Sequence, residues 1–178
     1  NTGCRLMSVA RNLADLIGGG STVASSSLPS GTVLQAKSVS HKTEYDITST
    51  SGEDIGLSIS ITPTSATSEF LLTGSIGING SSGNYCGIKL FRGSTEIGGG
   101  SGKTHNGYKI YYPVSDNNTE SASFSSLAIN FLDDPDTASS ITYKVQAFVS
   151  GGTGGVNHRN SSDDTNITSQ FTIMEIAG

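Results

Sequence analysis

The alternation of apolar and polar positions is clearest between residues 124 and 150. In its second half, apolar side chains stand at every second position with polar ones between them: Ile141, Tyr143, Val145, Ala147 and Val149 against Thr142, Lys144 and Gln146. A period of two is that of a strand with one buried face, and a helix is not compatible with it. The pattern therefore predicts a strand over these residues.

The first half of the same stretch predicts a second strand, with apolar residues on both faces. The two faces are formed by Leu127, Ile129 and Phe131 on one side and by Phe124, Ala128 and Leu132 on the other. Pro135 follows in an acidic turn over residues 133–136, and it ends the strand because proline lacks the N–H group that a ladder needs. We expect this strand to be covered on both sides and to form, with its antiparallel neighbour, the centre of a β-sandwich.

From residue 32 onward, short apolar stretches and turn signals follow one another at the spacing of a sandwich or jelly roll. The other expected strands are Val33–Ser40 with a continuation to Ile47, Leu57–Thr62, Glu69–Ile78, Cys86–Arg92, Thr95–Ile97, Tyr108–Val114, Val156–Asn160 and Gln170–Ala177. Glu53 and Asp54 are expected in a turn, and residues 151–155 in a flexible loop tip. The last strand is apolar on both faces, which places it inside its sheet and partly at a subunit interface. The predicted fold class is all-β, an antiparallel, jelly-roll-like β-sandwich.

The N-terminal stretch carries the one helical pattern, over Arg5–Ile17. Its apolar stripe combines Val9 or Ala10 with the four residues that we expect to act as anchors: Leu6, Leu13, Leu16 and Ile17. Three glycines at 18–20 end the pattern, and residues 21–31 have the composition of a linker. We divide the chain into an anchoring segment with its linker, 1–30, and a β-sandwich domain, 31–178. So short a helix needs a partner, which is either its own β domain or the same helix in neighbouring subunits.

Composition narrows the function classes. The net charge of −5 argues against nucleic acid as a partner, because binding to phosphates needs a basic patch. No apolar run approaches the length of a membrane span, so membrane insertion is not expected. Cys4 and Cys86 are the only cysteines, which is no disulfide framework, and Cys86 is expected as a small buried residue.

Three patterns resemble chemical sites without completing one. Residues 98–104 end like a phosphate-binding loop, but a strand rather than a helix follows them. Asp133, Asp134 and Asp136, with Asp163 and Asp164, are weak candidates for Ca²⁺ ligands, and solvated acidic turns are the commoner reading. The histidines at 41, 105 and 158 lack the spacing of a zinc site. We therefore assign no catalytic residues, no cofactor and no metal, and expect a protein that is not an enzyme.

Recognition, if present, is expected on three polar, glycine-rich loops that a rigid sandwich can present: Gly98–Gly107, Asn79–Asn84 and Gly151–Asn160. The candidate residues on and beside them are Asn84, His105, Tyr108, Tyr111, Tyr112 and His158. Tyrosine faces often hold sugars or proteins. Cross-strand packing is the commoner role of alternating tyrosines in a sheet.

Several segments of the sequence resemble a known family. They are SLPSGTVLQ (27–35), GLSISITPTSATSEFLL (56–72), IKLFRGSTEIGGG (88–100), FLDDPDTASSITYKVQ (131–146) and TIMEIA (172–177). Together they resemble a β-sandwich domain family of virion structural and tail-fibre-like proteins of marine, cyanophage-type bacteriophages. MSVARNLADLI (7–17) is similar to the short helical leader that often precedes such a domain.

The resemblance implies a virion location and other virion proteins as partners, but no catalytic motif. The role we expect is a trimeric fibre or a surface-displayed head domain that attaches to a glycan or protein of the host surface. A capsid decoration or cement protein is the alternative, and a carbohydrate-binding or polysaccharide-degrading domain is a further one. A homotrimer is expected because several strands are apolar on both faces, and closed symmetry covers such faces.

Overall fold

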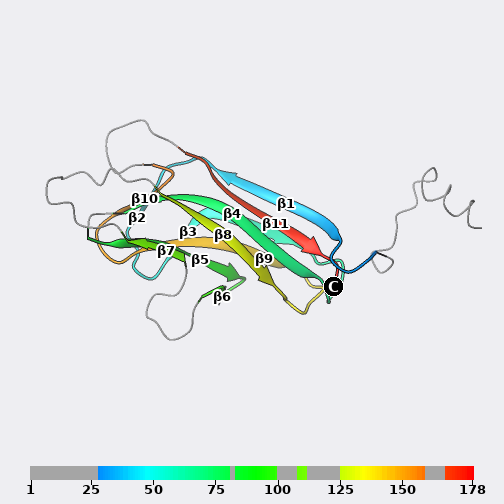
Figure 1. Ribbon diagram of the computed structural model, residues 1–178. Coiled ribbons are helices and arrows are strands. Elements are labelled where there is room, and N and C mark those ends of the chain that lie inside the picture. Colours follow the sequence, from blue (N-terminus) through cyan, green and yellow to red (C-terminus); the bar gives the residue numbers. More distant parts are fainter. Residues whose placement is uncertain (1–27, 81–82, 100–107, 112–124, 159–166) are drawn as a thin grey trace, which may run out of the picture.

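The computed structural model describes residues 28–80, 83–99, 108–111, 125–158 and 167–178, and within these ranges every regular element is a β-strand (Figure 1). The strands are β1 Val33–His41, β2 Tyr45–Ile47, β3 Glu53–Ile61, β4 Glu69–Asn79, β5 Tyr85–Arg92, β6 Thr95–Ile97, β7 Tyr108–Tyr111, β8 Ser125–Asp133, β9 Ile141–Val149, β10 Gly154–Val156 and β11 Ser169–Ile176. The expected helix at Arg5–Ile17 lies outside the described residues.

The strands form two antiparallel sheets. In the first sheet β1 pairs with β11 and β2 with β10, both β10 and β11 pair with β4, and β4 pairs with β8 on its other side. In the second sheet the order is β3, β9 and β5, and β5 then pairs with both β6 and β7. β1 and β2 can be taken as one interrupted strand, and so can β10 and β11, and β6 and β7. Every sheet then has four positions, and their order is that of a jelly roll. The predicted fold class is confirmed.

The strands on either side of the acidic turn are not partners of each other. β8 is the edge strand beside β4, whereas β9 lies inside the second sheet between β3 and β5. Residues 134–140 form the connection that crosses between the sheets, about 10 Å apart in sandwiches generally. The expected pairing of these two strands was therefore wrong, and the expected central position is right for β9 alone.

The outer side of β8 is also not covered by the described chain. Leu127 and Ile129 are buried, but Leu132 is 51% exposed and Ala128 is exposed. The prediction of cover on both faces was wrong, because apolar residues on both sides of a strand do not show whether the second side meets protein or solvent.

Two other boundaries differ from expectation. β3 begins at Glu53 rather than Leu57, because Glu53 pairs with Ala147 and Asp54 with Gln146 of β9, and Gln146 also donates a side-chain hydrogen bond to Asp54 (2.8 Å). β10 spans Gly154–Val156, so part of the expected loop tip is a buried strand. A Cβ atom on Gly154 would lie 2.7 Å from Val149 Cγ1 and 2.9 Å from Cys86 Sγ, and only glycine leaves room for this approach.

The core lies between the sheets and is formed by inward side chains of both. Its largest fully buried members include Tyr143, Phe70, Phe171, Ile76 and Ile88. β11 runs between β1 and β4, which confirms its predicted interior position. Cys86 is fully buried, as expected, and burial raises the pKa of its thiol to about 12.

The sandwich has two distinct ends (Figure 1). At the first, which we call the near end, the described chain begins and ends, and Gly31 N donates a hydrogen bond to Ala177 O (2.8 Å). Residues 62–68 and 134–140 also connect strands there. Residues 48–52 and 150–153 connect strands at the opposite end, the far end, where β4 also ends and β5 begins.

Candidate functional site

Two of the predicted recognition loops meet at the far end. Ser150 Oγ donates a hydrogen bond to Asn84 Oδ1 (3.1 Å) and accepts one from Tyr85 N (3.0 Å), while Ser150 N donates to Tyr85 O (2.9 Å). These bonds fix the residues after Val149 against those before β5. The structure thus brings Asn84 together with the start of the 151–160 loop.

A third loop, which the sequence analysis did not select, joins them. Val149 N donates to Ser49 O (3.0 Å), and the Glu53 carboxylate accepts hydrogen bonds from Thr48 N (2.9 Å) and Ser49 N (3.1 Å). Burial alone would raise the pKa of Glu53, but these backbone donors hold the pKa below its ordinary value. Residues 48–52 show only short serine and glycine turn signals, so nothing in the sequence distinguished them from other turns. We call residues 48–52, 83–85 and 150–153 the far-end loops.

His158 does not belong to the far-end loops. Its side chain is only 12% exposed, and Nε2 lies 3.1 Å from Asp46 Oδ1 on β2. The two residues line, with Glu44 and Tyr45, a shallow hollow of about 230 Å³. His158 is therefore held against the edge of the first sheet rather than presented at a loop tip.

The remaining candidates are placed as follows. Tyr108 and Tyr111 are the first and last residues of β7, which pairs with β5. His105, Tyr112, Asp163, Asp164 and the four anchoring residues Leu6, Leu13, Leu16 and Ile17 lie outside the described residues.

The acidic turn is built around an ion pair. Arg92 Nη1 lies 3.1 Å from Asp133 Oδ1 and 3.0 Å from Oδ2, and Tyr143 donates its hydroxyl to Oδ2 at 2.6 Å. Asp134 Oδ1 instead accepts a hydrogen bond from Asp136 N (3.3 Å). Within the described ranges, no three acidic, histidine or cysteine side chains cluster as metal ligands. Asp133 serves to join β8 of the first sheet to β5 and β9 of the second.

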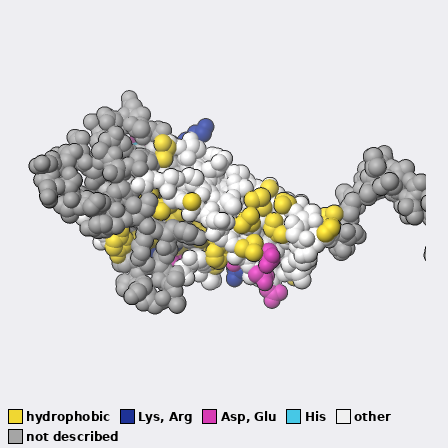
Figure 2. Space-filling view, in the orientation of Figure 1, with side chains coloured by type: hydrophobic (Ala, Val, Ile, Leu, Met, Phe, Trp, Pro, Cys, Tyr) yellow, Lys and Arg dark blue, Asp and Glu magenta, His cyan; other side chains and the backbone are white. Residues whose placement is uncertain are grey.

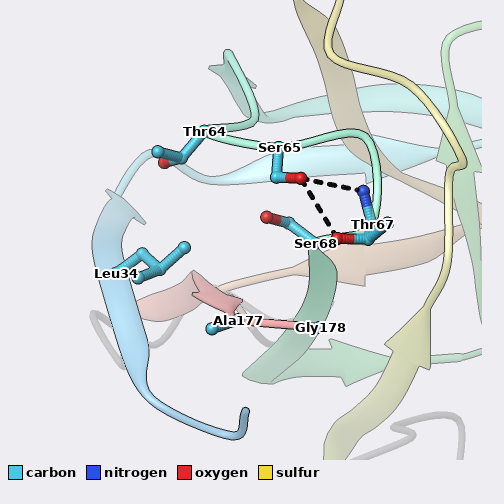
Figure 3. Close-up of a pocket in the computed structure, with 7 residues that line it drawn as sticks. All are labelled: Leu34, Thr64, Ser65, Thr67, Ser68, Ala177 and Gly178. Atoms are coloured by element: carbon cyan, nitrogen blue, oxygen red, sulfur yellow. Dashed lines mark hydrogen bonds between the residues drawn. The ribbon is translucent and has the colours of Figure 1, made fainter. Parts of the chain in front are cut away.

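The near end contains a pocket of about 290 Å³ (Figure 3). It is lined by Leu34, Thr64, Ser65, Thr67, Ser68, Ala177 and Gly178. In Figure 3, Ser65 Oγ bonds the backbone and the hydroxyl of Thr67, which stiffens the loop between β3 and β4. The pocket offers hydroxyl groups but no charged or aromatic side chain, so it shows no arrangement for catalysis.

A buried carboxylate ties this loop to the sheet. Glu175 is fully buried and accepts hydrogen bonds from Thr64 N (2.6 Å), Thr64 Oγ1 (2.9 Å) and Gln35 Nε2 (2.5 Å). Burial alone would raise the pKa of Glu175, but the hydrogen bonds outweigh it and lower the pKa below its ordinary value. The folded state therefore favours the ionised form of Glu175.

We expect Glu175→Gln to lower the free energy of unfolding at pH 7 by about 1–2 kcal/mol, because the amide cannot accept all the bonds of the carboxylate. Because the folded pKa is depressed, the stabilisation is complete above the unfolded pKa of about 4.3 and is lost as pH falls through the folded pKa. Urea unfolding at pH 7 and pH 3 should show the gap between wild type and variant shrinking. A gap that is equal at both pH values would contradict this. The matched control Glu69→Gln should stay within about 0.5 kcal/mol of wild type at pH 7.

The outer faces of the two sheets differ in charge. On the second sheet, Lys144 pairs with Asp54 (3.0 Å) and Lys89 with Glu96 (3.5 Å). The two lysines also lie over Phe91 and Phe148, each 5.6 Å from the ring centre. On the first sheet, Figure 2 shows apolar side chains gathered toward the near end with acidic ones at their margin. The second sheet therefore presents paired charges, and the first presents apolar side chains.

The structure corrects part of the argument for two-sided apolar strands. Phe70 and Phe148 are fully buried within this one chain, so neither asks for a partner subunit. Leu71, Met174 and Ile176 are half-buried on the outer face of the first sheet. Phe91 is half-buried on the outer face of the second sheet, where Lys144 lies over its ring. Among the described residues, the first sheet has the larger group of such apolar side chains.

No protein-family model matches the sequence, and a search of curated proteins found no match. Among solved structures, the chain is similar to the infectious bursal disease virus VP2 subviral particle, with 13% identity and a TM-score of 0.45 over 82% of this chain and 34% of that one. For the Gx strain of the same virus the identity is 10% and the TM-score 0.43, over 80% and 36% of the two chains. The chain thus spans about a third of the length of these proteins. So distant a likeness concerns the fold and says nothing of function.

In the ranges that the structure describes, no helix is long and apolar enough to cross a membrane.

Proposed function

We propose that this chain is a non-enzymatic structural protein of a bacteriophage virion, whose β-sandwich is displayed on the particle by its N-terminal segment. The observation that carries the proposal is the separation of the two ends. The described chain begins at the near end, where Gly31 bonds to Ala177, and the far-end loops lie at the opposite pole. A domain attached at one pole presents the other outward. The resemblance to fibre-like phage domains supports the same role.

Within that role, we propose a trimeric fibre or head domain that attaches to the host surface. The far-end loops are polar and are stiffened by the Ser150 and Glu53 bonds, which suits them to bind a glycan or a protein without a large ordering cost. The half-buried apolar residues on the first sheet support a homotrimer, because a ring of three subunits can cover one such face on each.

The second candidate is a capsid decoration or cement protein, and the apolar outer face of the first sheet favours it. In that case this face binds the capsid shell instead of sister subunits. A carbohydrate-binding or polysaccharide-degrading domain is the third, since jelly rolls also occur in lectins. Incubation with host polysaccharide and analysis of the products tests the third. Electron microscopy of labelled virions separates the first two by position on the tail or on the head.

Deletion of residues 1–27 tests the display arrangement directly. We expect the shortened protein to keep cooperative thermal unfolding, because the composition of residues 21–31 is that of a linker that separates the N-terminal segment from the β domain. It should no longer incorporate into particles, and light scattering at micromolar concentration should give a trimer for the full chain.

Two results would contradict the proposal. A shortened protein that fails to fold would show that the N-terminal segment is part of the core. A monomer mass for the full chain would contradict the proposed homotrimer.

A further inference from the structure

The outer face of the first sheet has no charged residue over three consecutive rows of cross-strand neighbours. These rows run across β1, β11, β4 and β8: Ala36, Met174, Leu71 and Leu132, then Ser38, Thr172, Thr73 and Asn130, then Ser40, Gln170, Ser75 and Ala128. We call the first of them the apolar row. The second sheet carries ion pairs on its outer face, so the lack of charge is specific to this sheet.

The apolar row extends toward the near end. One row further along, Val33 pairs with Ile176 and Ile176 with Glu69, so the apolar surface continues over β1 and β11 and ends at β4. Val33 is 51% exposed, as is Leu132 at the other edge. The described chain begins directly beside these residues, since Gly31 N bonds to Ala177 O. Whatever precedes residue 28 therefore leaves the domain at the edge of the apolar surface.

The N-terminal segment fits this surface in length and in chemistry. A helix over Arg5–Ile17 would be about 20 Å long at 1.5 Å per residue. The apolar row crosses four strands, which is about 14 Å between the outer strand axes at a spacing of about 4.8 Å. The stripe from Leu6 to Ile17 is apolar, and the row has no charge that its burial would desolvate. One helix lying across the strands covers the row.

We propose that the apolar row of each subunit is covered by residues 5–17 of a sister subunit. The linker is the reason for choosing the sister. Residues 18–27 span up to about 33 Å when extended. If the helix covered the row of its own subunit, it would start beside Val33, and the linker would not need this length. An arm longer than its own domain requires can reach the next subunit, and three such exchanges close a ring. The proposal rests on the homotrimer proposed above and assigns its contact surface.

Thiol cross-linking of the full chain tests the exchange. Cys4 stands at the start of the segment, and Cys86 is fully buried, so Cys86 will not react in the folded protein. We would place a second thiol at either edge of the sheet, by Asn130→Cys or by Ser38→Cys, and add a bis-maleimide. We expect cross-linked dimers and trimers on a denaturing gel for at least one variant. Ser58→Cys, exposed on the second sheet, is the matched control and should give none.

A charge substitution provides the second measurement. Leu132→Glu changes a side chain that is 51% exposed in the single chain, so we expect the variant to keep cooperative thermal unfolding. Its mass by light scattering should fall from trimer to monomer at micromolar concentration, whereas Ser58→Glu should remain a trimer.

The outcomes distinguish a failure of the proposed exchange from a failure of the proposed homotrimer. A wild-type trimer that gives no cross-link to Cys4, or whose Leu132→Glu variant stays trimeric, overturns the exchange and leaves the trimer standing. Cross-links confined to single chains show the segment on its own domain and also overturn it. A wild-type monomer removes the proposed trimer and the exchange together.

Discussion

Asp133→Ala is expected to lower the free energy of unfolding by about 3 kcal/mol, which for a domain of this size is a fall of about 6–12 °C in melting temperature. The Asp133 carboxylate is 7% exposed and accepts hydrogen bonds from Arg92 Nη1 (3.0 Å) and from the Tyr143 hydroxyl (2.6 Å). Its removal leaves the fully buried Tyr143 hydroxyl without its acceptor and the Arg92 guanidinium without its counter-charge. Thermal unfolding by circular dichroism measures the effect.

Two variants separate the buried network from the turn around it. Asp134→Ala removes a neighbouring exposed carboxylate but keeps the backbone carbonyl that Arg92 also contacts, so it should cost less than about 0.5 kcal/mol. Tyr143→Phe keeps the ion pair and removes one hydrogen bond, for about 1 kcal/mol. If Asp133→Ala were as mild as Asp134→Ala, the network would not hold the two sheets together.

Asn157→Ala should be as damaging as Asp133→Ala, at about 3 kcal/mol. Asn157 is fully buried with a φ of 64°, a left-handed conformation that Asn tolerates better than Ala. Its Nδ2 donates to His41 O (2.9 Å) and Thr43 O (3.1 Å), and its Oδ1 accepts from Ser169 Oγ (2.5 Å). These bonds hold the break between β1 and β2 against β11.

Asn157→Gly divides this cost. Glycine accepts the backbone angle and lacks the side-chain bonds, so it should be milder than Ala by about 1 kcal/mol. Asn130→Ala, at an exposed position, should cost less than about 0.5 kcal/mol. Denaturant unfolding of the three variants gives the comparison. A glycine variant less stable than the alanine variant would show that backbone strain is not part of the effect.

The position and type of the strands could be predicted from the pattern of side chains alone. Ile141 to Val149 alternates with a period of two and is β9, and the turn at Gly93 and Ser94 joins β5 to β6 as its sequence indicates. The boundaries that were missed involve residues whose usual preference is for turns. Asp54 and Gly154 lie in strands because they pair with Gln146 of β9 and Ile47 of β2. Those contacts come from segments far away in the sequence.

The candidate site was predictable only in part. Two of the far-end loops were selected for their glycine and polar content. The 48–52 loop was not, because the hydrogen bonds of Ser49 O with Val149 N and of Glu53 with Thr48 N and Ser49 N form only in the folded chain. Asp133 was considered as a metal ligand because three aspartates share one turn. Its actual partners, Arg92 and Tyr143, come from strands of the other sheet.

The sequence by itself determined that the chain is all-β, where most strands lie, and that Cys86 is buried. These properties follow from local periodicity and turn chemistry, which neighbouring residues set. Only the tertiary structure decided that β8 and β9 belong to different sheets, that Phe148 is covered while Leu132 is exposed, and that three rows on the outer face of the first sheet carry no charge. The physical reason is that side-chain alternation shows only that a strand has two different faces. The groups that each face contacts depend on strands that are far apart in the sequence and pair in the fold.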